Sequence, residues 1–112
     1  MDIRKNNNIK LSLVVPVFNE SETVSLFVER VNEVFSSHRE ITIEFVFIND
    51  GSQDDTFEKL ISLKSVNKNI CVVDLSRNFG KEAALSAGLN IATGDVVVPL
   101  DVDLQDPPEV II

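Results

Sequence analysis

Strand-like apolar runs alternate with helix-like segments along most of this chain, and the alternation limits the fold more than any other feature. Residues 11–18, 41–48, 69–76 and 95–100 are short runs rich in valine, isoleucine and leucine, which is typical of strands covered on both faces. The segment 21–35 repeats apolar residues at helical spacing. Strands that alternate with helices predict an α/β fold with a parallel sheet.

The expected strand order is 3-2-1-4, because the crossovers in such units are right-handed. In that order the topology switches between the first and fourth strands, and ligands bind beyond the carboxyl ends of the strands at such a switch. Polar side chains follow those ends in this sequence, at residues 18–20, 49–52, 76–78 and 101–106. We therefore expect one polar rim at the switch.

Three helices are expected between the strands. The first spans residues 21–35, with Asn19 or Ser21 as its N-cap and Glu22 in its first turn, and the third spans residues 81–92. Gly94 suits the left-handed position after the third helix. The residues expected to face the sheet are Phe57, Leu60 and Ile61 on the second helix, and Ala84, Ala87, Gly88 and Ile91 on the third, where small side chains allow close packing.

Composition excludes several classes of protein. A net charge of −8 over 112 residues argues against a nucleic-acid surface, and no apolar run approaches the roughly 20 residues that span a bilayer. Residues 1–10 lack the apolar middle of a signal peptide and are expected to form a flexible lead-in to a single domain at 11–112. Because Cys71 is the single cysteine of the sequence, an internal disulfide is excluded, and we expect its side chain to be buried. His38 is expected to lie in a solvated loop.

The acidic run after the fourth strand predicts a metal site. Alternation along an extended segment points Asp101, Asp103 and Gln105 to one side, and their oxygens suit Mg²⁺ or Mn²⁺ with positions left for phosphates and water. The alternative is an acidic strand end that only improves solubility. A calcium-binding EF-hand loop is excluded, because Asp106 and Ile112 stand where that loop needs glycine and glutamate.

Three other polar residues at the rim have both a structural and a functional interpretation. Asp50 can belong to an ordinary Asp-Gly turn, or it can accept hydrogen bonds from a base or a ribose. Arg77 and Lys81 can be solvated, or they can balance a diphosphate. The glycine patterns of nicotinamide dinucleotide sites and of P-loops are absent, and the isolated His38 leaves no Ser-His-Asp or Cys-His set.

Five segments in order, "VVPVFNE", "FINDGSQDDT", "LSRNFGKEAALSAGL", "ATGD" and "DVDLQDPPEVI", resemble family 2 glycosyltransferases of the GT-A fold. The resemblance is strongest to the polyisoprenyl-phosphate type, which includes bactoprenol glucosyltransferases and dolichol-phosphate mannose synthases. It covers nearly all of the chain from Leu11 onward. It implies that the sheet is the Rossmann-like nucleotide-binding half of that fold.

The resemblance also implies a role for each matching residue. The nucleoside would be bound by Pro16, Phe18, Glu20 and Asp50, with Arg77 and Lys81 near the nucleotide and its phosphates, Asp101 near the ribose and the metal, and Asp103 and Gln105 holding Mg²⁺ or Mn²⁺. No residue here matches the family's catalytic base, which is expected beyond residue 112. Asp106, Pro107 and Glu109 start a helix that the chain does not continue, so we expect an incomplete domain that is inactive alone.

The expected function is the binding of a nucleotide sugar, UDP-glucose or GDP-mannose, in an inverting transferase. The resemblance implies a hexose, glucose from UDP-glucose, and a polyprenyl phosphate acceptor such as undecaprenyl phosphate. The parent protein would act at the cytoplasmic face of the cell membrane, whereas this chain is expected to be soluble and cytoplasmic. An unpaired fourth strand also predicts a homo-oligomer.

Three other classes of protein share some of these features. A soluble family 2 transferase that extends a polysaccharide stays open, as does a non-catalytic nucleotide-binding module. A receiver-type signalling domain needs an acidic pair at the end of the first strand and an aspartate at the end of the third. The first strand here ends in Phe18, Asn19 and Glu20, and Asp74 is followed by more of the third strand, which argues against that class.

Overall fold

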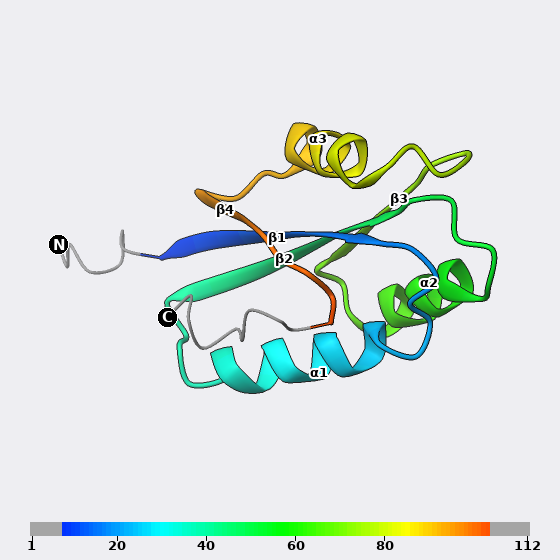
Figure 1. Ribbon diagram of the computed structural model, residues 1–112. Coiled ribbons are helices and arrows are strands. Elements are labelled where there is room, and N and C mark those ends of the chain that lie inside the picture. The colour runs from blue at the N-terminus through cyan, green and yellow to red at the C-terminus, as the bar shows by residue number, and fades with distance from the viewer. Residues whose placement is uncertain (1–7, 104–112) are drawn as a thin grey trace, which may run out of the picture.

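The computed structural model describes residues 8–103, which form one parallel sheet flanked by helices (Figure 1). The elements in chain order are β1 (Ile9–Val17), α1 (Val24–Phe35), β2 (Ile41–Asn49), α2 (Thr56–Val66), β3 (Ile70–Asp74), α3 (Lys81–Ile91) and β4 (Val96–Pro99). The strands lie in the order β3-β2-β1-β4, and every neighbouring pair is parallel. The predicted α/β fold and strand order are confirmed.

The sheet is the middle of three layers (Figure 1). Helices α1 and α2 cover one face, where the larger part of the core lies. Phe27 of α1 packs edge-on against Phe45 and Phe47 of β2, with ring centroids 6.2 and 6.0 Å apart, and all three side chains are fully buried. This face holds the odd-numbered residues of β1 and β2, as the two-residue period of a strand requires.

Helix α3 covers the opposite face and lies very close to it. A Cβ atom on Gly88 would lie 2.5 Å from both Ile48 Cδ1 and Val14 Cγ1, so no larger residue fits without repacking. Ala84, one turn earlier, is also fully buried. The prediction that small residues bring this helix close to the sheet is confirmed.

Strand β1 pairs unequally with its two neighbours. It pairs with β2 along nine residues but with β4 along only four, ending at Val14 and Pro99. Val14 accepts a hydrogen bond from the N–H of Leu100, and alternation places Pro16 on the same side of β1. Because proline has no N–H, the ladder to β4 cannot continue there, and β4 separates from β1 at its carboxyl end.

Several local predictions were wrong. Helix α1 begins at Val24 rather than Ser21, and its N-cap residue Thr23 makes no side-chain capping bond. Residues 21–23 instead form a turn, in which the carbonyl of Glu20 accepts the N–H groups of Thr23 and Val24. Strand β1 starts at Ile9, two residues earlier than expected.

The predicted inner faces of α2 and α3 were correct at Leu60, Ala84 and Gly88 but wrong at Ile61 and Ile91. Ile61 and Ile91 are 44% and 41% exposed. The buried stripe of α2 runs through Thr56, Leu60 and Leu63, and that of α3 continues from Ala84 and Gly88 to Ala92. These stripes follow steps of three or four residues, so a neighbour in sequence is rotated about 100° away from the sheet.

Gly94 does not have the predicted left-handed backbone, since only Asn19, Gly51 and Gly80 have positive φ in the described part of the chain. It is instead required by a close approach. A Cβ atom there would lie 2.8 Å from the carbonyl oxygen of Lys10, against the backbone of β1.

Cys71 is half-buried rather than buried, because β3 is an edge strand. His38 is partly exposed, and its Nδ1 lies 3.5 Å from Glu40 Oε1. No helix within residues 8–103 is long and apolar enough to cross a membrane. The predicted capping of a last helix by Asp106 and Glu109, and most of the predicted lead-in, lie outside the described residues.

Candidate functional site

A pocket opens where β1 and β4 separate, at the carboxyl ends of β1, β2 and β4. Residues from four separate segments line it: Pro16, Val17, Phe18, Glu20, Asp50, Lys81, Asp101, Val102 and Asp103. Seven of these nine are predicted site residues. The structure therefore brings most of the predicted set together at the predicted switch point, while their roles toward a ligand stay predictions.

Glu20 is held in the pocket by hydrogen bonds to the first residue of α2 and to the turn before α1. Its backbone N–H donates to Thr56 Oγ1 at 2.9 Å, and its Oε2 accepts the hydroxyl of Thr23 at 2.9 Å. Thr56 is fully buried and also donates its N–H to Asp54. The hydrogen bond from the Thr56 hydroxyl lowers the pKa of Asp54. The sequence did not point to Thr56, because nothing in it distinguishes a threonine that binds a distant loop from any other threonine at the start of a helix.

The loop after β1 is tied to the loop after β2 by Asn19. This residue has a φ of 54°, a left-handed conformation that asparagine tolerates better than most residues. Its N–H donates to Ser52 Oγ at 2.9 Å, and its side-chain oxygen accepts the N–H of Gln53 at 2.8 Å. Asn19 thus joins two loops at the rim and does not cap α1.

Asp50 fastens the loop that leads into α3. Its side chain is only 4% exposed, and its two carboxylate oxygens accept the N–H groups of Phe79 at 2.8 Å and Gly80 at 3.1 Å. Gly51 packs directly beneath the same loop, because a Cβ atom there would overlap the backbone of Arg77 and Asn78. Asp50 therefore has a structural role that the sequence did not reveal, besides lining the pocket.

Lys81 and Asp101 form an ion pair across the pocket. Lys81 Nζ lies 2.7 Å from Asp101 Oδ1, with the two side chains 62% and 32% exposed. The hydrogen bond to Asp101, with its charge and that of Asp103, raises the pKa of Lys81. This contact supplies the anionic partner that a lysine needs in the first turn of a helix, where a positive charge is otherwise unfavourable.

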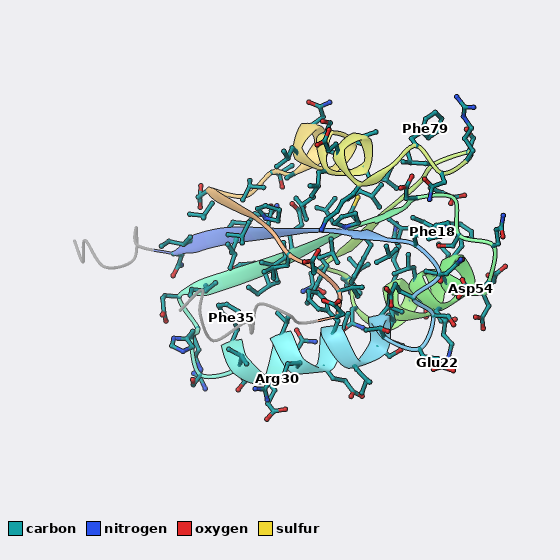
Figure 2. The ribbon with its side chains drawn as sticks, viewed as in Figure 1. Phe18, Glu22, Arg30, Phe35, Asp54 and Phe79 are labelled. Atoms are coloured by element: carbon teal, nitrogen blue, oxygen red, sulfur yellow. The ribbon has the colours of Figure 1, made fainter. Side chains whose placement is uncertain are left out.

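Arg77 does not line the pocket. Its guanidinium carbon lies 4.6 Å from the centre of the Phe79 ring, and both side chains are exposed. Phe79 and Phe18 lie at the same end of the molecule (Figure 2). The predicted role of Arg77 toward a nucleotide therefore has no support from the pocket geometry, because Arg77 lies in the connection between β3 and α3 and contacts Phe79 instead. Gln105 lies outside the described residues.

The donor atoms suit a hard divalent cation. Asp101 and Asp103 present carboxylates to the same pocket. Within residues 8–103 no three acidic, histidine or cysteine side chains are grouped to hold a metal. That is compatible with Mg²⁺ or Mn²⁺, because such sites commonly use one or two carboxylates and complete the coordination with substrate phosphates and water. The residues present therefore fit a cation that arrives with a phosphate ligand.

A second polar cluster lies on the α3 face, at the opposite end of the strands. Ser12 is fully buried and donates to Glu44 Oε1 at 2.6 Å, while its oxygen accepts the N–H of Gly94 at 2.8 Å. Thr93 donates to Glu44 from both its N–H and its hydroxyl. Burial alone would raise the pKa of Glu44, but these bonds and the charge of Lys10 outweigh burial and lower it. This cluster fixes the start of β4 to β1 and β2.

Solved structures with this arrangement of strands include enzymes that bind nucleotide sugars. A mannosyltransferase from Pyrobaculum calidifontis, in complex with GDP-Man and Mn²⁺, superposes with a TM-score of 0.75 at 23% identity, over 86% of this chain and 28% of that one. Staphylococcus aureus TarS in complex with UDP-GlcNAc superposes with a TM-score of 0.67 at 26% identity, over 84% of this chain and 26% of that one. The fold is that of the GT-A glycosyltransferases.

Curated relatives are much closer in sequence. A prophage bactoprenol glucosyl transferase homologue from Escherichia coli K12 is 53% identical over 104 residues, which cover 92% of this chain and 33% of the relative. An uncharacterised glycosyltransferase from Synechocystis is 48% identical over 103 residues, covering 92% of this chain and 32% of the relative. The chain thus spans about a third of the length of these relatives.

The sequence profile described as Glycosyl transferase family 2 matches residues 12–112, which contain every residue of the pocket. The pocket, the strand order and this match agree with one another, and the chain belongs to glycosyl transferase family 2.

Proposed function

We propose that this chain is the nucleotide-sugar-binding part of a glycosyltransferase that transfers glucose from UDP-glucose to a polyprenyl phosphate at the cytoplasmic face of a membrane. The observation that carries the proposal is the pocket at the carboxyl ends of β1, β2 and β4, which is lined by Glu20, Asp50, Asp101 and Asp103. The 53% identity to bactoprenol glucosyl transferases supports the choice of sugar and acceptor.

Different residues of the pocket suit different parts of a nucleoside diphosphate sugar. Pro16 and the half-exposed Phe18 offer apolar surface to a base, with the carboxylate of Asp50 nearby. Asp101 and Asp103, on the segment that follows β4, would hold a divalent cation. When bound there, the cation would stabilise the negative charge of the departing nucleoside diphosphate.

The binding of the donor should depend on the cation. The four carboxylates and a diphosphate repel one another by about 1 to 4 kcal/mol for each close pair, over effective dielectric constants of about 80 to 20. Lys81, the single basic residue among those that line the pocket, can offset only part of this. Mg²⁺ or Mn²⁺ should therefore tighten the binding of the nucleotide at least about tenfold, or about 1.4 kcal/mol.

Calorimetric titration tests the proposal with UDP, UDP-glucose and GDP-mannose, each in Mn²⁺ and in chelator. We expect UDP and UDP-glucose to bind, and Asp103→Asn to abolish the gain from Mn²⁺. Asp55→Asn is the matched control, since Asp55 is exposed and makes no side-chain capping bond. Equal affinity in Mn²⁺ and chelator, or an Asp103→Asn protein that still responds to Mn²⁺, would contradict the site.

The chain alone is expected to transfer no sugar. A base that activates the acceptor must lie within hydrogen-bond reach of the proton that it removes. We propose donor or cation binding, and not this role, for the polar residues that line the pocket. The assay is the transfer of radiolabelled glucose from UDP-glucose to undecaprenyl phosphate in detergent. Transfer by the purified chain would mean that a residue of this pocket acts as the base.

A further inference from the structure

The ion pair between Lys81 and Asp101 has a consequence for the order in which ligands bind. Asp101 is one of the two carboxylates proposed above to hold the cation, and its Oδ1 already lies 2.7 Å from the ammonium group of Lys81. An ammonium group and a divalent cation at the same oxygen repel each other. A metal ion that uses this oxygen must therefore displace Lys81.

The position of Lys81 argues that the contact does not serve the stability of α3. Lys81 is the first residue of that helix, and a positive charge at a helix N-terminus is unfavourable. Gly80, which precedes it, is already held by Asp50, so the start of the helix is fixed without the lysine. The lysine side chain instead extends into the pocket and reaches the carboxylate across it.

The ion pair between Lys81 and Asp101 can also be broken at little cost in free energy. Its side chain is 62% exposed, and an exposed ion pair holds its partners only weakly. It is the single basic residue among the nine that line the pocket. A diphosphate in the pocket would thus find Lys81 as its nearest cationic partner and compete with Asp101 for it.

We propose that Lys81 is an internal counter-ion that keeps the metal side of the pocket closed to a free divalent cation and releases Asp101 when a nucleoside diphosphate draws its ammonium group away. The proposal rests on the proposed function for the identity of the ligand. It predicts that this acidic pocket, in a chain of net charge −8, binds a divalent cation only weakly before the donor arrives. By thermodynamic reciprocity, the same exchange makes the nucleotide favour the binding of the metal.

The test is Lys81→Met, which keeps much of the apolar stem and removes the charge. Binding of Mn²⁺ alone is followed by the loss of the electron paramagnetic resonance signal of free Mn²⁺, and binding of UDP in chelator is followed by calorimetry. We expect Lys81→Met to tighten Mn²⁺ binding about three- to fivefold and to weaken UDP binding in chelator at least about threefold. Lys64→Met, on the exposed part of α2, should change neither affinity.

A double-mutant cycle separates competition at Asp101 from a general effect of charge. In an Asp101→Asn background, the gain in Mn²⁺ affinity from Lys81→Met should fall below about twofold, because the pair that the lysine forms is already gone. Thermal unfolding of each variant confirms that it is folded. A gain that persists in full in the Asp101→Asn background would overturn direct competition.

Other outcomes also decide the question. Equal binding of Mn²⁺ by the wild type and by Lys81→Met, including no binding by either, overturns the proposal. If instead the wild type fails to bind UDP in the presence of Mn²⁺, the proposed function is wrong. The comparison with Mn²⁺ alone would still show whether Lys81 competes for Asp101, so the two failures are distinguishable.

Discussion

Asp50→Asn is the substitution that best separates the structural role of this residue from its role toward a ligand. Asparagine keeps the shape of the side chain but replaces one acceptor oxygen with an NH₂ group. One of the two N–H groups, of Phe79 or of Gly80, then faces a donor instead of an acceptor. The loop before α3 then loses one of its two hydrogen bonds to residue 50, which directly follows β2.

The size of the effect follows from the burial of the carboxylate. A hydrogen bond to a charged group contributes about 1.5 to 3 kcal/mol, and the second bond weakens when the acceptor becomes neutral. Because Asp50 is only 4% exposed, water cannot readily replace the lost acceptor. We expect Asp50→Asn to lower the free energy of unfolding by about 2 to 4 kcal/mol.

Urea unfolding measures this loss, and amide hydrogen exchange locates it at Phe79 and Gly80. Binding of UDP should weaken by the same factor in Mn²⁺ and in chelator, because Asp50 is proposed to contact the base and not the cation. Asp55→Asn, an exposed aspartate, should stay within about 0.5 kcal/mol of the wild type. Unchanged stability together with unchanged protection of both amides would refute the reasoning.

Two further predictions test the packing and the polar cluster. Gly51→Ala should lower the free energy of unfolding by about 3 to 5 kcal/mol, because it adds backbone strain at a φ of 71° to an overlap with the backbone of residues 77 and 78. Gly80 has a φ of 99° but open space around it, so Gly80→Ala should lower the free energy of unfolding only by the backbone strain of about 1 to 3 kcal/mol. Urea unfolding in which Gly80→Ala is the more destabilising of the two substitutions would contradict the geometry. The lowered pKa of Glu44 means that its ionised form stabilises the fold above its unfolded pKa of about 4.3, and that this stability is lost as the pH falls through the lower folded value. Urea unfolding of Glu44→Gln from pH 6 to pH 3 should therefore show a shallower loss of stability than the wild type, and parallel curves would count against the role of Glu44.

The parts of the fold that could be predicted depend on patterns among residues close together in the sequence. The apolar runs and the handedness of crossovers were sufficient for the strand order, and Gly88 was correctly read as a point of close packing. Ile61 and Ile91 were misplaced because several faces of a short helix look apolar in sequence, and only the position of the sheet selects one. The role of Gly94 depends on the backbone of β1, more than 80 residues away in sequence.

The candidate site was predictable where residues follow the ends of strands. The acidic residues lie together because parallel strands end at one edge of the sheet. The roles of Thr56 and Asn19 could not be predicted, because each depends on a hydrogen bond between segments more than 30 residues apart in sequence. The placement of Arg77 over Phe79, away from the pocket, likewise depends on how a short loop turns.

The unequal pairing of β1 gives the two halves of the pocket different mechanical stiffness. The nine-residue ladder to β2 makes the part of the pocket proposed to bind the nucleoside a rigid surface, whereas the four-residue ladder to β4 stops at Val14, before Pro16. Residues 101–103 lie beyond the last hydrogen bond to β1, from Leu100 to Val14, so they can shift without breaking a strand pair, and the part of the pocket proposed to receive phosphates and a cation is the more compliant one. A library that varies this compliant half could change the preferred donor while the rigid half keeps the domain folded.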